Sequence, residues 1–347
     1  MIAADVPIQR PASAKLLVID GNGHLTHAPR QRLLDFLRPG DLLIANDAAT
    51  VPASLSGQHR PSGMKVEVRL AGRLFPAREP SADSRFAAVI FGEGDYRTPT
   101  EHRPLPPSVT AGDRLDLGPL EAIVSNLLGH PRLASLSFTG SIDAMWAGIA
   151  RHGRPVQYAH VPTPLALWDV WTILAGRPVA FEPPSAGFVL DWRMLSELRQ
   201  RHIGFATLTH AAGLSSTGDI ELDRRLPLDE PYEIPDGTAR RIAETRARGG
   251  RIVAVGTTVV RALEAAATRD GHIVAGGGVA TQRITAGTRL RVIDALISGT
   301  HAPGTSHYDL LRAFADEATL ARADQELDAQ EYRTHEFGDS VLIERRA

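Results

Sequence analysis

The chain has 347 residues, of which 43% are hydrophobic, so a sizeable core is available and global disorder is excluded. It contains no cysteine, which excludes disulfides and thiolate metal sites. Its net charge of −2 shows no overall basic excess, so contact with a nucleic acid needs a local basic patch. No segment approaches the roughly 20 apolar residues of a membrane helix, and no basic start precedes an apolar run. We therefore expect a cytoplasmic protein without a membrane partner.

Strand and helix signals alternate at the start of the chain. Residues 16–20 (LLVID) predict a strand that ends at the turn GNG, and residues 31–37 (QRLLDFL) have helical spacing. Residues 41–45 (DLLIA) predict a second buried strand, which leads directly into Asn46 and Asp47. This alternation is typical of an α/β domain.

The pattern changes between about residues 66 and 149. Short strand patterns such as KVEVRL, RFAAVIF and RLASLSFTG follow one another, separated by Gly, Pro, Asp and Ser. Such spacing predicts a small β-barrel or sandwich. We interpret residues 56–150 as a β-barrel domain inserted into an α/β domain that is formed by residues 1–55 and 151–347.

Helix and strand alternate again after a proline-rich segment at residues 155–184. Asp236 is the expected N-cap of one helix, and Gly249 is its expected stop. The pattern predicts helices at residues 192–202, 236–248, 259–269 and 308–315, and strands at residues 205–209, 251–255 and 340–344. The fold class that follows is α/β, with a mainly parallel sheet covered by helices.

The stretch AVGTTVVRALEAAA is the first candidate for a binding site. Gly256 ends an apolar strand, and Thr257 and Thr258 open a helix at the strand's carboxyl end, where open α/β sheets usually bind ligands. The free N–H groups and positive dipole of a helix start attract anions. No Glu or Gln follows three residues later to close the turn. The alternative is an ordinary turn that a threonine hydroxyl caps.

Three further stretches place polar side chains in loops or at strand ends. His301 lies in a Gly/Pro-rich loop after the apolar run VIDALI, where it can be a general acid or base or a plain loop residue. Asn46 and Asp47 can bond a ribose or an amine, or cap the next turn. Ser185, in the turn PPSAG, can cap the next helix beside a pocket or belong to a simple connection. No HExxH motif occurs, so we expect no metal.

Taken in order, these stretches resemble the S-adenosylmethionine:tRNA ribosyltransferase-isomerase family of queuosine biosynthesis. LRPGDLLIANDAATVPASLSG is similar to the family's Leu-x-Pro-Gly-Asp-Leu-Leu-Val-x-Asn-Asp-Thr-Arg-Val-Ile-Pro-Ala-Arg-Leu, and AVGTTVVRALEAA matches Ala-Val-Gly-Thr-Thr-x-x-Arg-x-Leu-Glu. LISGTHAPGTSHYDLLRAF and YRTHEFGDSVLI resemble two C-terminal motifs and align His301 and Asp339 with family positions. The resemblance covers nearly the whole chain and implies an α/β domain with an inserted β-barrel.

The resemblance also implies a reaction. The ribosyl part of S-adenosylmethionine is transferred to 7-aminomethyl-7-deazaguanine in tRNA and is isomerised to epoxyqueuosine. S-adenosylmethionine is the co-substrate and small-molecule donor, and tRNA is the expected macromolecular partner. Adenine and methionine are released. The family positions present here suggest His301, Glu230 and Asp339 as catalytic candidates. The substrate-binding candidates are Gly256, Thr257, Thr258, Arg261, Glu264, Asn46, Asp47, Ser185, Gly187 and His210.

Several positions depart from the family pattern. Ala49 replaces an arginine, and Val189, Thr209 and Leu228 replace histidines, with His210 next to the second of these positions. A pocket that keeps its helix start but loses polar contacts suggests two alternatives to the family reaction. One is a divergent paralogue that uses the same donor with another acceptor, such as a free deazapurine, and the other is a non-catalytic, ligand-binding relic.

Overall fold

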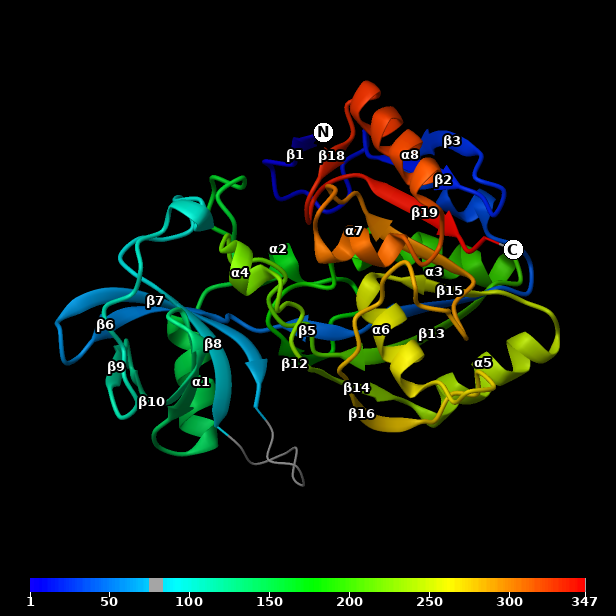
Figure 1. Ribbon diagram of the computed structural model, residues 1–347. Coiled ribbons are helices and arrows are strands. Elements are labelled where there is room, and N and C mark those ends of the chain that lie inside the picture. The colour runs from blue at the N-terminus through cyan, green and yellow to red at the C-terminus, as the bar shows by residue number, and fades with distance from the viewer. Residues whose placement is uncertain (75–83, 347) are drawn as a thin grey trace.

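The computed structural model describes residues 1–74 and 84–346, and Figure 1 shows a β-barrel beside a larger α/β part. A nine-stranded sheet forms the centre of the α/β part. Its strands, in spatial order, are β16 (Gly276–Ala280), β14 (Glu230–Ile234), β13 (Gly204–His210), β4 (Leu42–Asn46), β15 (Ile252–Val255), β17 (Ala295–Gly299), β19 (Ser340–Glu344), β2 (Lys15–Ile19) and β3 (Leu25–Pro29).

The sheet is mixed, so the prediction of a mainly parallel sheet is wrong. The central strands β13, β4, β15 and β17 run parallel to one another, as do β19 and β2. Antiparallel pairs join β17 to β19, and they form both edges, β13–β14–β16 and β2–β3. A short turn such as the one between β2 and β3 makes the two strands antiparallel neighbours. The alternation of strand and helix signals in the sequence does not reveal such pairs.

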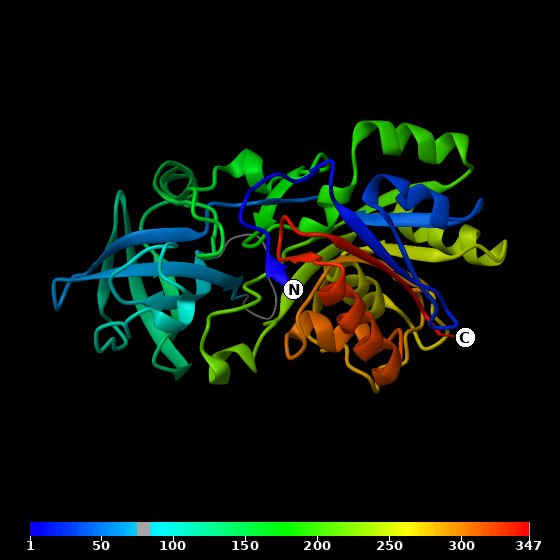
Figure 2. The ribbon, with the colours of Figure 1, turned by 90° about the horizontal axis from the view of Figure 1, so that it is seen from above.

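Successive residues of the central strands face opposite sides of the sheet, which is why each side has its own core. In β4, Leu42 and Ile44 pack with the residues of α6 (Thr257–Ala266), whereas Leu43 and Ala45 pack with those of α3 (Trp192–Gln200). Figure 2 shows helices on both sides of the sheet. The helices and 3-10 helices of the described residues are η1 (Arg30–Phe36), η2 (Thr100–His102), α1 (Ile142–His152), α2 (Leu167–Val170), η3 (Ser185–Val189), α3 (Trp192–Gln200), α4 (Ile220–Asp223), α5 (Asp236–Ala247), α6 (Thr257–Ala266), α7 (Ser306–Leu311) and α8 (Glu317–Ala329).

Local details of three helices differ from the sequence prediction. Asp236 is the first residue of α5 and not its N-cap, which is Pro235 without a side-chain bond. Ser185 opens the 3-10 helix η3 and does not cap it. Helix α8 is absent from the prediction, although the carboxylate of Asp316 caps it by accepting a hydrogen bond from the Thr319 amide at 2.8 Å.

The strand-rich segment forms a closed barrel with its own apolar core. The barrel order is β10 (Leu120–His130), β11 (Leu133–Phe138), β8 (Arg85–Phe91), β7 (Met64–Arg73), β6 (Ser54–His59) and β9 (Arg114–Leu117). Residues 75–83, which the strand-rich prediction also covers, lie outside the described residues. The predicted boundary between residues 55 and 56 falls within β6, and the division into domains stays a prediction.

Three short strands lie outside the barrel and the large sheet. β5 (Ala48–Thr50) follows β4 closely and pairs in parallel with β12 (Arg177–Ala180), while β1 (Ile2–Ala3) pairs with β18 (Arg333–Thr334). The β18 pairing ties the N-terminus of the described chain to the loop before β19. None of the helices found in the described parts of the chain has both the length and the apolar character needed to cross a membrane.

Candidate functional site

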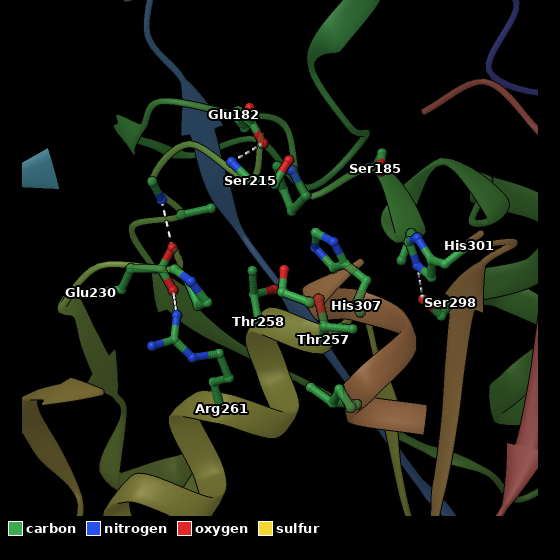
Figure 3. A pocket seen from close by; sticks show the side chains of 18 of the residues that line it. Glu182, Ser185, Ser215, Glu230, Thr257, Thr258, Arg261, Ser298, His301 and His307 are labelled. Carbon is green, nitrogen blue, oxygen red and sulfur yellow. Dashed lines mark hydrogen bonds and ion pairs between the residues drawn. The ribbon is translucent and has the colours of Figure 1, made fainter. Parts of the chain in front are cut away.

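A pocket lies at the carboxyl ends of β15 and β17, where the strand-end rule places ligands. It encloses about 980 Å³ of space between atoms, a figure that includes open solvent. The start of α6, the β17–α7 loop and the segment before η3 form much of its wall. Figure 3 shows Thr257 and Thr258 between Glu230 and Arg261 on one side and His307 and His301 on the other.

The start of α6 faces this pocket without a cap. Gly256 is the N-cap residue; no described side chain caps the backbone N–H groups of the first turn, and the turn contains no acidic residue. The Gly256 backbone has φ +96° and ψ 150°, a region that is almost exclusive to glycine. A Cβ there would lie 3.4 Å from both the Cβ of Ala186 and the Thr258 hydroxyl oxygen. The alternative of a threonine-capped turn is therefore wrong. The Gly256 N–H donates to the Ile297 carbonyl at 2.8 Å, whereas the N–H groups of Thr257 and Thr258 remain available to an anion.

Arg261 and Glu230 form a buried ion pair on one wall of the pocket. Arg261 also donates to the Ala280 carbonyl at 3.0 Å, and Glu230 accepts from the Gly213 amide at 2.6 Å. The Nε2 atom of His210 lies 3.4 Å from Glu230. Burial, aided by the charge of Arg261, lowers the pKa of His210 to about 3, so its ring is neutral. Glu230 is thus held in place by partners on several sides.

His301 lies in the loop after β17 and His307 in the first turn of α7, and their rings stack with centroids 4.7 Å apart. The Nε2 atom of His301 lies 2.9 Å from the Ser298 hydroxyl oxygen. Burial lowers the pKa of His301 well below its usual value, with smaller contributions from His307 and His335. Burial likewise lowers the pKa of His307 to about 4. Both rings are neutral at pH 7, which makes them proton acceptors and poor proton donors.

Glu182, in the same pocket, is a possible proton donor, unlike the two neutral histidines. Burial raises its pKa to about 7, although hydrogen bonds from Ser215 and Tyr158 act to lower it. The Tyr158 hydroxyl lies 2.5 Å from one carboxylate oxygen, and the Ser215 amide donates to the other at 3.1 Å. A carboxyl group with this pKa is partly protonated at neutral pH and can donate or accept a proton.

Several predicted site residues lie outside the pocket lining. The Glu264 carboxylate is buried and accepts three backbone amides, those of residues 291–293, at 2.8 to 3.1 Å. The Asp339 carboxylate accepts the amides of Lys15 and Arg333 at 2.6 and 2.7 Å. Both side chains therefore connect separate segments of backbone. Their carboxylates are occupied in these bonds, so the structure does not bring them to the pocket.

The other predicted residues divide in the same way. Asn46 holds His210 through two backbone hydrogen bonds of 2.9 Å and approaches the Thr258 hydroxyl at 3.4 Å, so it positions α6 from behind the pocket. Asp47 accepts a hydrogen bond from the Thr209 hydroxyl at 2.7 Å. Gly187 packs inside η3, where a Cβ would lie 3.0 Å from a side-chain carbon of Thr172. The predicted residues that do line the pocket are Gly256, Thr257, Thr258, Arg261, Glu230, Ser185 and His301.

Sequence reasoning missed eight polar residues of the pocket wall: Glu182, Ser215, Arg283, Thr285, Ser298, Ser306, His307 and Asp309. Glu182 directly precedes the turn PPSAG, and His307 lies six residues after His301, in the first turn of α7. Both are therefore close to predicted site residues, but nothing in their local sequence indicates burial or a shifted pKa. Only the packing of distant segments makes these side chains distinctive.

Comparison with known proteins agrees with this architecture. The model of the family described as "Queuosine biosynthesis protein" matches residues 1–343. The chain belongs to this family. The resemblance found in the sequence is thereby confirmed.

Two curated relatives carry the name S-adenosylmethionine:tRNA ribosyltransferase-isomerase, which is the name of an enzyme. The one from Gloeobacter violaceus is 33% identical over 98% of this chain and 92% of its own length. The one from Sorangium cellulosum is 34% identical over 99% of this chain and 95% of its own length. A crystal structure of S-adenosylmethionine tRNA ribosyltransferase from Thermotoga maritima covers 98% of this chain and 96% of its own, with a TM-score of 0.51 and 23% identity, and supports the fold.

Three of the four departures from the family pattern have structural explanations in this chain. Val189 is buried in the apolar core beside the sheet, and Leu228 packs against the core of the barrel. Thr209 uses its hydroxyl to bind Asp47. These three positions thus serve packing and local bonding, while His301 and His307 supply imidazoles to the pocket.

Proposed function

We propose that the chain catalyses the reaction for which its relatives are named. The ribosyl part of S-adenosylmethionine is transferred to 7-aminomethyl-7-deazaguanine in a tRNA and isomerised to epoxyqueuosine, with release of adenine and methionine. Membership of the queuosine family over residues 1–343 and the names of full-length relatives support this proposal. S-adenosylmethionine is consumed as a co-substrate, and the tRNA is the acceptor.

The observation that carries the proposal is the uncapped helix start of α6 in the pocket wall. The methionine part of the donor ends in a carboxylate, which needs a compact anion site. The N–H groups of the first turn and the positive end of the helix dipole provide one. Gly256 has no side chain, so a carboxylate can approach the backbone closely. We assign the donor carboxylate to the turn of Gly256, Thr257 and Thr258, where the N–H groups of Thr257 and Thr258 donate to it and Gly256 allows its close approach.

The protonation states in the pocket suit the remaining chemistry. The sulfonium of the donor makes the neighbouring C5′ protons more acidic, so a modest base can remove one, and the neutral imidazole of His301 is our candidate. Adenine leaves more easily when a ring nitrogen is protonated, and Glu182, with a pKa of about 7, is our candidate acid. Glu230 keeps Arg261 in position beside the donor site through their ion pair.

Release of adenine tests the proposal. Wild-type protein is incubated with S-adenosylmethionine and tRNA that carries the 7-aminomethyl-7-deazaguanine precursor, and adenine is measured by chromatography. We expect release with precursor tRNA and no release with an otherwise identical tRNA that carries guanine at that position. Release with free 7-aminomethyl-7-deazaguanine but not with the tRNA would instead establish the paralogue with a changed acceptor. Donor binding without release under either condition would establish the non-catalytic alternative.

A further inference from the structure

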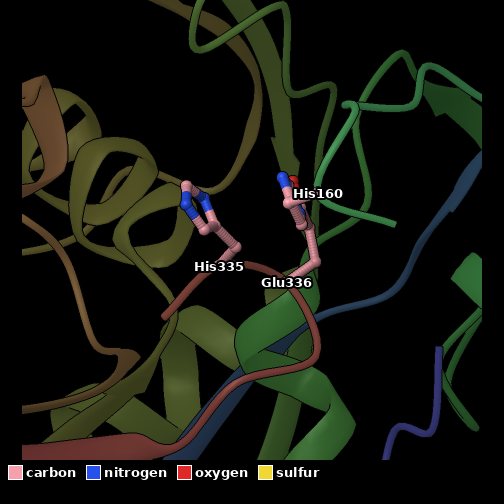
Figure 4. A group of neighbouring side chains, drawn as sticks. All are labelled: His160, His335 and Glu336. Atoms are coloured by element: carbon pink, nitrogen blue, oxygen red, sulfur yellow. The ribbon is translucent and has the colours of Figure 1, made fainter. Parts of the chain in front are cut away.

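A second group of titratable side chains lies next to the pocket, outside the residues assigned above. His160 precedes α2, and His335 and Glu336 lie in the loop between β18 and β19. The Nε2 atom of His160 is 3.1 Å from a Glu336 carboxylate oxygen, and the rings of His160 and His335 stack with centroids 4.2 Å apart. Figure 4 shows the three side chains together, brought from two distant segments of the chain.

Backbone hydrogen bonds hold the β18–β19 loop, which carries His335 and Glu336, in a defined geometry. The Asp339 carboxylate accepts the amide of Arg333, and the Asp339 amide donates to the Arg333 carbonyl at 2.8 Å, which closes the loop at its base. The Gly338 amide donates to the His335 carbonyl at 3.0 Å. His335 itself has φ +70°, an uncommon backbone region for a residue other than glycine. The position of the His335 ring therefore depends on the closed loop.

The ligand atoms of the three side chains lie close enough to one another to reach a single metal ion. One ligand atom from each lies within 4.8 Å of the others, so a single point lies within about 2.8 Å of all three, and zinc bonds of about 2.0–2.2 Å need shifts of under about 1 Å. Two imidazoles and one carboxylate also form a donor set that zinc uses in proteins, with a fourth position left open.

Aromatic packing with Tyr158 also supports His160. The Tyr158 ring stacks on His160 with centroids 6.2 Å apart and an interplanar angle of 9°. The Tyr158 hydroxyl bonds Glu182 and the Ser216 carbonyl, so the ring that supports His160 is itself anchored. Support of this kind orients a ligand before the metal arrives.

We propose that the chain binds one divalent transition-metal ion of the zinc class through His160, His335 and Glu336. The site borders the pocket, because a Cβ built on Gly299, a pocket residue, would lie 3.9 Å from both the His301 ring and the His335 carbonyl. The metal ion would be a further bound species, in addition to the S-adenosylmethionine and tRNA of the proposed reaction. The site stands on the geometry of the three side chains and does not depend on the proposed reaction.

Zinc titration of the full chain tests the site. Calorimetry with Zn²⁺ should give one saturable site per chain, and Co²⁺ in its place should give the visible absorption of a cobalt ion bound by nitrogen and oxygen. His335→Asn keeps a residue type that tolerates positive φ, and Glu336→Gln keeps the shape of the side chain. Because loss of an outer partner already weakens metal sites by about 10–100-fold, loss of either ligand should weaken Zn²⁺ binding by about 100-fold or more.

His24→Gln is the matched control, because His24 is an exposed histidine 3.3 Å from the carboxylate of Asp20 without a third donor in the group. This variant should bind Zn²⁺ as the wild type does. Circular dichroism confirms that each variant is folded, and His160→Gln provides a third independent ligand deletion if one of the others does not fold. Zn²⁺ affinity that stays unchanged in the folded ligand variants, or no saturable Zn²⁺ binding by the wild type, would overturn the proposal.

Discussion

Replacement of Gly256 by valine should weaken S-adenosylmethionine binding more than tenfold. The Gly256 backbone, at φ +96° and ψ 150°, is almost closed to residues with a Cβ, and forcing one into such a region costs about 1–3 kcal/mol. The turn is therefore expected to relax, which moves the N–H groups of Thr257 and Thr258 away from the position that a carboxylate would occupy. A valine side chain also occupies space at this point of the pocket wall.

The magnitude follows from the contacts that would be lost. A hydrogen bond to a charged group contributes about 1.5–3 kcal/mol, and a helix start adds about 0.3–1 kcal/mol for a nearby anion. Loss of one such bond together with the helix term gives roughly 2–4 kcal/mol. Since about 1.4 kcal/mol corresponds to a factor of ten in affinity, the dissociation constant should rise by roughly 30-fold or more.

Isothermal titration calorimetry with S-adenosylmethionine measures this change directly. Gly40→Val is the matched control, because Gly40 also has a positive φ, +91°, but lies outside the pocket lining, with no atom within 4 Å of a Cβ. The control should lose stability from backbone strain and keep the affinity of the wild type. A folded Gly256→Val protein that binds the donor as tightly as the wild type would refute the assignment of the anion site to this turn.

Three further predictions test individual side chains. His301→Ala should lower kcat by about 10²–10⁴-fold, the usual contribution of a general acid or base, with donor affinity nearly unchanged; turnover equal to the wild type would leave His301 as a loop residue. Glu182 faces Tyr158, Ser215 and the charge of Glu336. If Glu182 is the proton donor, kcat should fall as pH rises above about 7, and Glu182→Gln should remove this fall from the pH–rate profile. The pKa of Glu182 in the folded state is raised from 4.5 to about 7, so the folded state binds more protons than the unfolded state between these pH values. The contribution of Glu182 to the free energy of unfolding therefore decreases as pH rises through this window. Urea unfolding of Glu182→Gln should lack this decrease. Glu264→Ala should reduce the free energy of unfolding by roughly 3–5 kcal/mol, because it leaves three backbone amides without their buried acceptor; unchanged stability with weakened donor binding would return Glu264 to the substrate site.

The sequence predicted the elements whose signals are local. The apolar run before Gly256 and the threonines after it predicted β15 followed by α6, and the structure has both, with the helix start in the pocket wall. Alternating short strands predicted a barrel, and the described strands of this segment close into one. The order of motifs along the chain also identified the family. Each of these inferences needs only the type and spacing of neighbouring residues.

Residues with similar sequence signals nevertheless have different roles in the folded chain. Glu230 and Glu264 are both carboxylates in matched motifs, yet one lines the pocket beside Arg261 and the other binds the backbone of residues 291–293. Asp339 matches a family position as well as His301 does, but it closes the β18–β19 loop. Whether a carboxylate reaches a pocket depends on which backbone amides approach it, and these amides come from distant segments.

The sequence by itself determined the family, the strand–turn–helix unit at Gly256 and the strand-rich insertion, because motif spacing and side-chain periodicity act over a few neighbouring residues. The tertiary structure alone decided the antiparallel edges of the sheet, the protonation of Glu182 and the meeting of His160 with His335. Burial by segments far apart in the chain raises the pKa of Glu182, since water that would solvate its charge is excluded. His160 and His335 lie 175 positions apart in the chain, and only the packing of the β18–β19 loop against the segment before α2 places their rings 4.2 Å apart.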